Sequence, residues 1–441
     1  MSNRLLAHGI GGASDLPIPL SYAVVGAGWA LTVSFAVLAF SWRTSRFRGE
    51  RAGRDLPRLL ATVVDSAVLR GALRVFGLVV AAVLAWAALF GQDSPANPAL
   101  GIFFIYLWVG MVPLSLLLGN VWPRLSPMRT LHLVLSWVLR TSPERGLVAY
   151  PSWLGYWPAA IGLFAYIWVE LIPDPQLVSN AITWCLVYAA AMLVGSAAFG
   201  SHWFTRADPF EVWFGLVARL SPWGRRDGRV VVRSPLDNLD ATTVDRGLVA
   251  VVAVLLGSTA FDSFSASNWW LNYTAVPGAL DPTLRDTLVL LGFVLFVAVT
   301  FCVAAVTAPG MSWPDRRRLP RLLAHSLVPI SIGYVFAHYF TLLLESGQKY
   351  LVYLSDPLVT GEHDYLGTID WTTTYFLSVR PGLVAALKVG FVLTGHILGV
   401  IAAHDRAVRV LPMRHAVSGQ LAMLAVMVVY TTGGLLLLFS V

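Results

Sequence analysis

The amino-acid sequence predicts an all-α, polytopic membrane protein with about ten transmembrane helices and both termini outside the cell. Three observations support this class. Hydrophobic residues make up 57% of the 441-residue chain, and charged residues only 12%. Hydropathy rises in about ten separate segments, each long enough to cross a bilayer. The basic residues are concentrated in alternate connections between these segments, which is typical of cytoplasmic loops.

The apolar segments are expected to be helices, because every backbone polar group inside hydrocarbon has to be satisfied within its own segment. Tryptophans near several segment ends suit an aromatic belt at the membrane interface. The expected spans are 21–42, 74–91, 101–118, 154–172, 179–199, 247–263, 286–308, 323–345, 381–402 and 416–439.

The distribution of Lys and Arg indicates the orientation. Of these 31 residues, 26 fall on one side, in the connections 43–73 (with Arg74), 119–153, 200–246, 309–322 and 403–415. Acidic residues divide evenly between this side and the rest of the chain, so the basic connections carry the net positive charge. The positive-inside rule places them in the cytoplasm of a cell bounded by this membrane. We therefore expect a plasma-membrane protein whose basic loops contact anionic lipid headgroups, and no nucleic acid partner.

The remaining segments form a single transmembrane domain, 21–441, preceded by an outer N-terminal segment, 1–20. The outer loop 346–380 is acidic, and the stretch 59–74 is expected to be an amphipathic helix on the inner surface. Both cysteines fall inside spans, which argues against a disulfide framework.

A faint internal repeat is visible at two inner corners. Gly119-Asn-Val-Trp122, followed by Pro127, resembles Gly200-Ser-His-Trp203, followed by Pro209. Each corner leads into an apolar stretch with helical spacing. Either an internal duplication or a coincidence of interfacial Trp and Pro residues accounts for this pattern.

Ionisable residues near the outer ends of three spans are the main candidate site, because charge inside a bilayer is costly and asks for an explanation. Glu170, Asp262 and His338, which precedes Tyr339, are expected to converge there. Together they offer oxygen and nitrogen ligands for a divalent transition metal of unknown identity, with His8 as a fourth ligand or an acid. Such a site would activate a water molecule, or the same residues would pass protons.

Structural interpretations of these residues remain open as well. Glu170 and Asp262 lie within about a turn of a helix end, where a carboxylate reaches headgroup water. Asp262 also has backbone N–H groups and serines near it. His338 lies deeper, which favours a functional role.

A second layer of histidines lies near the inner face. His325 follows Arg321 and is interpreted as a cap or a snorkelling side chain, whereas His396 is expected to bond a carbonyl across helices. His404-Asp405-Arg406 is interpreted as the solvated start of a loop with a weak local ion pair. These three histidines and Tyr339 are secondary candidates for the site.

Several stretches resemble a family of actinobacterial multi-pass membrane proteins, many of them labelled fenitrothion hydrolase. The stretches are His8-Gly-Ile-Gly-Gly, Asp15-Leu-Pro-Ile-Pro, Gly257-Ser-Thr-Ala-Phe-Asp262, Ala324-His325-Ser-Leu-Val-Pro329, Ala337-His338-Tyr339, Gly395-His396 and Ala403-His404-Asp405-Arg406. The resemblance spans nearly the whole chain and implies cleavage of an organophosphate ester, with no assigned catalytic residues.

Three functional classes follow from these observations. The first is a metal-dependent, membrane-embedded hydrolase in which His338, Asp262 and Glu170 hold a metal-bound hydroxide. The second is a proton-linked transporter or permease that uses the same residues. The third is a non-catalytic subunit of a membrane complex.

Overall fold

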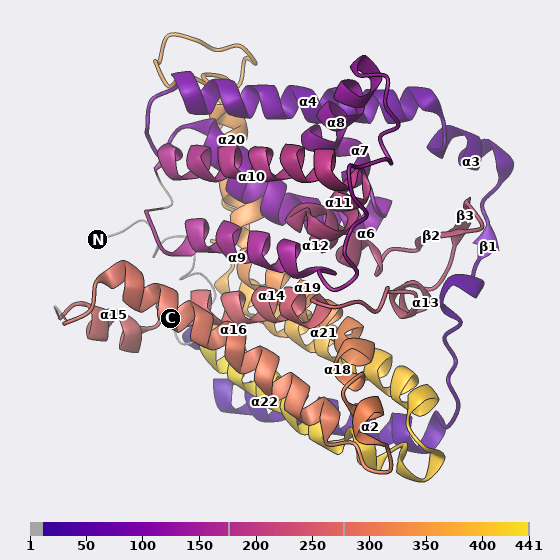
Figure 1. Ribbon diagram of the computed structural model, residues 1–441. Helices are drawn as coiled ribbons and strands as arrows, with labels where there is room; N and C mark the ends of the chain where they lie inside the picture. The colour runs from indigo at the N-terminus through magenta and orange to yellow at the C-terminus, as the bar shows by residue number, and fades with distance from the viewer. Residues whose placement is uncertain (1–11, 175–176, 277, 440–441) are drawn as a thin grey trace.

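The computed structural model describes residues 12–174, 177–276 and 278–439, and these residues form an almost entirely helical protein (Figure 1). In these ranges, nine helices are long and apolar enough to cross a membrane. The all-α polytopic class is therefore confirmed. The long helical segments are α2 (Leu20–Ser41), α4 (Ala67–Phe90), η3 (Gly101–Gly110) with α6 (Met111–Leu118), α10 (Val178–Phe199), α14 (Leu248–Ser265), α16 (Pro282–Val306), α19 (Val328–Thr341), α21 (Pro381–Val410) and α22 (Leu421–Leu438).

Shorter helices connect and extend these segments. They are α3 (Arg58–Val64), α5 (Pro98–Leu100), α7 (Trp122–Leu125), α8 (Pro127–Val138), α9 (Trp157–Leu171), α11 (His202–Ala207), α12 (Pro209–Ala218), α13 (Pro235–Asp240), α15 (Asn268–Thr274), α17 (Trp313–Arg316), α18 (Leu319–Leu323) and α20 (Gly347–Tyr353). Single turns lie at η1 (Ala13–Asp15), η2 (Gly49–Arg51), η4 (Ala324–Leu327), η5 (Leu342–Ser346), η6 (Met413–His415) and η7 (Ser418–Gln420).

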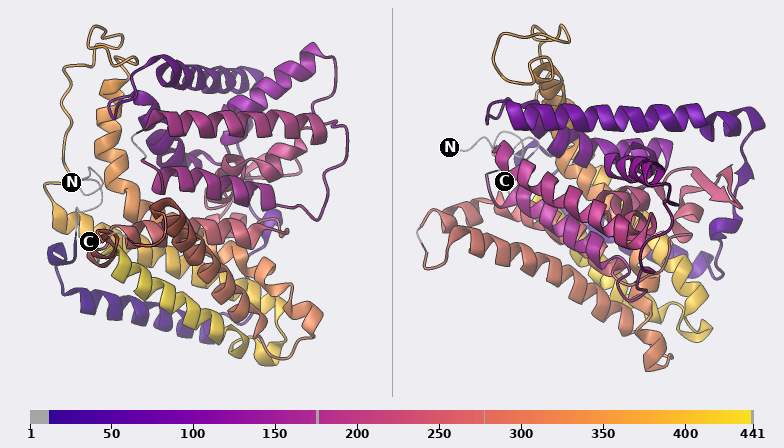
Figure 2. Two further views of the ribbon diagram at one scale, coloured as in Figure 1. Left: turned by 60° about the vertical axis from the view of Figure 1, so that its left-hand side comes forward. Right: turned by 45° about the horizontal axis from the view of Figure 1, so that its top comes forward.

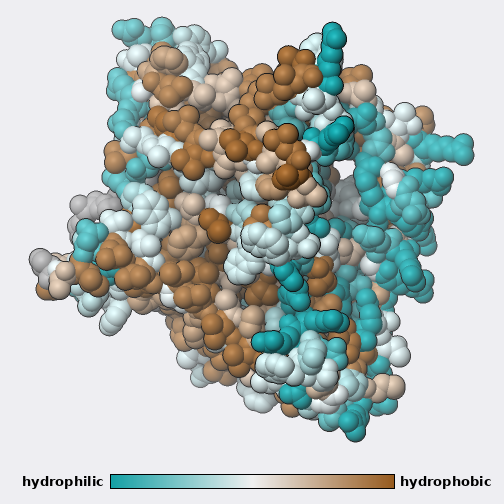
Figure 3. Space-filling model, viewed as in Figure 1, coloured by the Kyte–Doolittle hydropathy of each residue, from teal (hydrophilic) through white to brown (hydrophobic). Residues whose placement is uncertain are grey.

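The two ends of the helical bundle differ in chemistry. One end carries a small antiparallel sheet in the order β1-β3-β2, formed by β1 (Arg54–Asp55), β2 (Trp223–Arg226) and β3 (Arg229–Val232). Hydrophilic residues gather there, at the right of Figure 3, while much of the rest of this face is hydrophobic. We call this end of the bundle, where the sheet carries Arg54, Arg225, Arg226 and Arg229, the basic end. Helix α2 begins and α22 ends at the opposite end (Figures 1 and 2), consistent with termini on one side.

Three expected boundaries are wrong. The stretch 59–74 is not one surface helix, because it is interrupted at Ser66. The Ser66 hydroxyl accepts the backbone N–H of Leu69 at 3.1 Å and caps the start of α4. The fourth span is only the 15-residue α9. The ninth expected span, 381–402, is part of a longer helix. Helix α21 continues to Val410, because its last turns are packed inside the basic end.

The connection 200–246 enters the bundle, contrary to the expectation of a simple cytoplasmic loop. Its helix α12 packs against α6, α9 and α19. All but one of the ten α12 residues are buried, among them Glu211 and Trp213. An apolar helix of ten residues is too short to cross a bilayer, so α12 enters the bundle without spanning it.

The two corners of the suspected repeat have the same local structure. Gly119 and Gly200 end their helices with φ of 80° and 65°, a conformation that favours glycine. A short helix follows each corner, and the next helix, α8 or α12, begins with proline. Helix α8 then packs on α10 and α12 packs on α6. This reciprocal packing fits a duplication, which nevertheless stays a prediction.

The most extensive helix packing is between α19 and α21, where glycines bring the two backbones together. A Cβ atom on Gly395 would lie 2.6 Å from the carbonyl oxygen of Pro329 and 3.3 Å from the Cα of Gly333. Small residues that allow such approach are common in membrane helix pairs. This contact positions α19, the helix that carries His338.

Candidate buried proton-transfer site

The outer candidate residues come from three helices, α14 and the two helices α9 and α19 that pack on it. Helix α14 contacts α9 on one side and α19 on the other. Glu170 comes from the last turn of α9, Asp262 from the last turn of α14, and His338 and Tyr339 from α19. The expected convergence of these spans is therefore observed.

Asp262 and His338 form the centre of the cluster. Nε2 of His338 lies 2.8 Å from Oδ2 of Asp262, and the two side chains are only 6% and 7% exposed. The Tyr339 hydroxyl donates to the same carboxylate oxygen at 2.8 Å. Asp262 is thus not simply a carboxylate that bonds nearby backbone N–H groups, because it joins α14 to α19.

Ser263 extends the cluster on the far side of the imidazole. Its Oγ lies 3.3 Å from Nδ1 of His338. The ring therefore stands between a hydroxyl and a carboxylate, both carried by the end of α14. In a neutral ring with the proton on Nε2, Nε2–H donates to Asp262 and Nδ1 accepts from Ser263. In a charged ring, both nitrogens donate. Such a ring can hand a proton from one partner to the other.

Glu170 supplies a second carboxyl group. Its Oε2 is inaccessible and has no hydrogen-bond partner among the described residues, although the residue as a whole is partly exposed. Glu170 and Asp262 are close enough to interact electrostatically. Charge on two carboxyl groups at once is costly in an apolar interior, so such pairs are suited to sharing a proton.

The predicted metal site is not seen as a complete ligand set. Among the described residues, no three His, Cys, Asp or Glu side chains are grouped closely enough to hold a metal ion. The expected fourth ligand, His8, lies outside the described residues. Metal binding at His338, Asp262 and Glu170 therefore stays a prediction.

The acidic outer loop is linked through Glu345 to η5, the turn that follows α19, and Glu345 does not join the cluster. Glu345 is buried, and its carboxylate accepts the backbone N–H groups of Leu377 and Ser378 at 2.9 and 2.8 Å. Within the loop, the Ser355 hydroxyl donates to Asp364 and holds the pKa of that carboxyl below its usual range. These acids order the loop.

The inner histidines have local partners. Nδ1 of His325 lies 3.1 Å from the Leu322 carbonyl oxygen, so this buried side chain does not snorkel. Nδ1 of His396 lies 2.9 Å from the carbonyl oxygen of Val392, one turn earlier in its own helix, and not across helices as expected. Neither residue contacts the outer cluster in the described structure.

The interpretation of His404-Asp405-Arg406 as a solvated loop start is wrong. All three residues are buried. Asp405 accepts hydrogen bonds from the Trp42 indole at 3.0 Å and the Ser45 hydroxyl at 2.7 Å. Arg406 binds Asp240 through Nε and Nη2 at 3.0 and 2.8 Å. The triplet is buried because the chain after α2 and the end of α13 fold over it.

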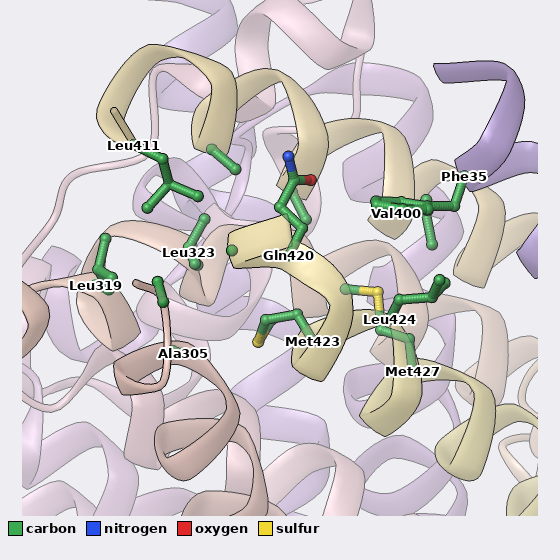
Figure 4. A pocket seen from close by; sticks show the side chains of 14 residues that line it. Phe35, Ala305, Leu319, Leu323, Val400, Leu411, Gln420, Met423, Leu424 and Met427 are labelled. Carbon is green, nitrogen blue, oxygen red and sulfur yellow. The ribbon is translucent and has the colours of Figure 1, made fainter. Parts of the chain in front are cut away.

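A small cavity lies beside His404 at the basic end, between α2, α16, α18, α21 and α22. Figure 4 shows Gln420 surrounded by apolar side chains, including Met423 and Met427. Oε1 of Gln420 accepts from Nδ1 of His404 at 3.1 Å. The cavity has a volume of about 20 Å³, enough for roughly one water molecule. It is too small for a substrate.

No protein-family model, curated protein or solved structure matches this chain. The resemblance to the fenitrothion hydrolase family therefore stays a prediction, and the site has to be interpreted from its geometry.

Several buried residues of the bundle were not singled out by the sequence. Trp108, Trp213 and Ser115 lie in apolar stretches, where a tryptophan or a lone serine is usually part of the core. Glu211 is different, because an acid inside the apolar run PFEVWFGLVA is a signal that could have been noticed.

Proposed function

We propose that this protein is a proton-linked transporter or permease in which Asp262 and His338 take up and release the proton. The observation that carries the proposal is the 2.8 Å contact between His338 Nε2 and Asp262 Oδ2 inside the helical bundle. Ionisable pairs at membrane depth are rare and costly, and proton relays are one of their established uses. The wider group around the pair supports this use.

The chemistry of the pair suits reversible protonation. An imidazole ring can both accept and donate a proton, and Nε2 of His338 faces a carboxylate oxygen of Asp262 that can accept one. Ser263 and Tyr339 orient the two groups with hydrogen bonds that either protonation state can keep. Glu170 offers the next carboxyl group, so a proton leaving Asp262 has an acceptor within the bundle.

The pair also links proton binding to helix packing. Asp262 is on α14 and His338 is on α19, so the attraction between these helices changes when the pair gains or loses a proton. A transporter needs such a coupling between an ion and a movement of helices. The arrangement therefore supports coupled movement of a proton and a second solute.

Hydrolysis makes a further demand on the surroundings of the pair. A hydrolase has to place a scissile bond within hydrogen-bond reach of its base or metal-bound water. The metal-dependent hydrolase and the complex subunit stay predictions from the sequence.

Proton uptake into vesicles tests the proposal. The purified protein is reconstituted with an entrapped pH-sensitive dye, and an inward proton gradient is imposed. The assay is run in buffer alone and with the filtered small-molecule fraction of a bacterial extract, which supplies co-substrates. We expect faster acidification than in protein-free vesicles, and its loss in Asp262→Asn, which keeps the size of the side chain but cannot exchange a proton.

Glu362→Gln is the matched control, because this exposed acid of the outer loop also loses its charge and lies outside the cluster. It is expected to keep the wild-type rate. Two results would contradict the proposal: equal rates with and without wild-type protein in both solutions, or an unchanged rate in a folded Asp262→Asn. Near-stoichiometric metal that is lost in His338→Ala would instead favour the hydrolase.

A further inference from the structure

Buried polar atoms without partners continue from the cluster toward the basic end. Among the described residues, Nε1 of Trp108, Nε1 of Trp213 and Oγ of Ser115 are inaccessible and have no hydrogen-bond partner. They come from three different helical segments, η3, α12 and α6. Buried polar groups are nearly always paired with protein, water or a ligand, so each of these atoms needs an explanation.

Ser115 differs from most buried hydroxyls in the described helices. Many of these hydroxyls bond a carbonyl oxygen of the preceding turn, as Ser136, Ser258, Ser331 and Thr431 do. Ser115 is 0% exposed and makes no such bond. Its hydroxyl is therefore directed toward some other partner.

The two indoles connect the cluster to this serine. Glu170 interacts electrostatically with Tyr166, whose ring lies 5.0 Å from the ring of Trp108. The Trp108 and Trp213 rings are 6.4 Å apart. Ser115 follows Trp108 by two turns toward the basic end, where α6 packs on α12. These three unpaired atoms therefore belong to segments that pack on one another.

The backbone around Trp108 is also unusual. Trp108 lies in η3, a π-helical stretch of ten residues, which packs against a second π-helical turn, η5. Wide turns of this kind are rare and are frequently found at functional sites. They are tolerated at membrane depth where neighbouring groups or water satisfy the backbone.

A second group of buried acids lies at the start of α12. Asp208 accepts hydrogen bonds from the Trp122 indole at 3.0 Å and the Tyr188 hydroxyl at 3.1 Å. Glu211 binds Arg129 with two contacts of 2.6 and 3.0 Å. Burial raises the pKa of Asp208 to about 6, which suits a group that exchanges protons near neutral pH.

We propose that a file of bound water molecules passes Trp108, Trp213 and Ser115 and connects Glu170 to the acid pair Asp208 and Glu211. An indole N–H only donates, so its partner is an acceptor, and water can accept from it and donate onward. Water is the ligand that satisfies separated donors and also carries protons. The inference rests on the proposed function and supplies its route to the basic end.

Radiolytic hydroxyl-radical labelling tests the water file without any transport assay, because buried side chains are oxidised when a bound water lies next to them. In the wild-type protein, we expect oxidation of Trp108 and Trp213. Trp184 of α10 is the internal control. It is also buried, but the rings of Phe103, Tyr166 and Tyr188 pack around it. Exposed Trp269 is the positive control. Labelling of Trp269 alone would overturn the water file.

The role in proton movement is tested by the double variant Trp108→Phe and Trp213→Phe, which removes both donors and keeps two aromatic rings. Its acidification rate in vesicles is expected to fall at least tenfold, while Trp184→Phe keeps the wild-type rate. An unchanged rate in the folded double variant would overturn the route and leave the role of Asp262 standing. A wild-type protein that moves no protons would overturn the proposed function, while labelling would still decide whether water is present.

Discussion

Replacing Arg406 by Met is expected to destabilise the protein by about 3 kcal/mol, because it leaves a buried carboxylate without its main partner. Arg406 and Asp240 are 8% and 4% exposed at their side chains. Arg406 also donates to the backbone oxygen of Asp240 at 2.6 Å. The loss is at the lower end for a buried ion pair because Arg409 still contacts Asp240 at 3.1 Å.

Thermal and denaturant unfolding in detergent would measure this effect. Arg414→Met is the matched control, since Arg414 is exposed and its removal should change stability by less than about 0.5 kcal/mol. Adding Asp240→Leu to Arg406→Met removes both buried charges and is expected to restore part of the loss. Equal stability of Arg406→Met and Arg414→Met would show that the triplet is solvated after all.

Replacing Gly395 by Ala is the second large expected effect. The added Cβ would lie 2.6 Å from the Pro329 carbonyl oxygen, which belongs to a rigid backbone and cannot move aside. Overpacking of this kind costs about 1–3 kcal/mol. Because α19 also carries His338, we expect proton uptake to fall together with stability.

Gly390→Ala gives a control of opposite sign. Gly390 lies in the same helix, and a Cβ atom there meets nothing within 4 Å. Alanine is a better helix former than glycine by about 1 kcal/mol, so this variant should be neutral or stabilised. The unfolding midpoint of Gly395→Ala is therefore expected to fall, while that of Gly390→Ala stays the same or rises. The same midpoint for both variants would contradict the close packing of α19 on α21.

The helical class could be predicted from the sequence because the bilayer imposes it. The thickness of the hydrocarbon layer sets the length of the apolar segments. The positive-inside rule accounts for the arginines being concentrated on one side of the membrane. Helix α12 was not predicted as a buried element, since ten apolar residues are too few for a span. Its place in the bundle depends on packing against three helices far apart in the sequence.

The candidate site was predicted in part. Asp262 and His338 were expected to converge because both lie toward the outer ends of their helices. Their pairing at 2.8 Å, and the position of Ser263 on the other ring nitrogen, depend on side-chain orientation that a sequence does not show. His404, Asp405 and Arg406 were misjudged because the segment that covers them, after α2, is distant in sequence.

The most direct test of proton exchange at Asp262 and His338 is infrared difference spectroscopy of the membrane-reconstituted protein while pH is changed. We expect carbonyl-stretch bands of a carboxylic acid and ring bands of histidine that change together. Both should vanish in Asp262→Asn and remain in Glu362→Gln. A difference spectrum that is identical in wild type and Asp262→Asn would contradict the proposal that this buried pair exchanges a proton.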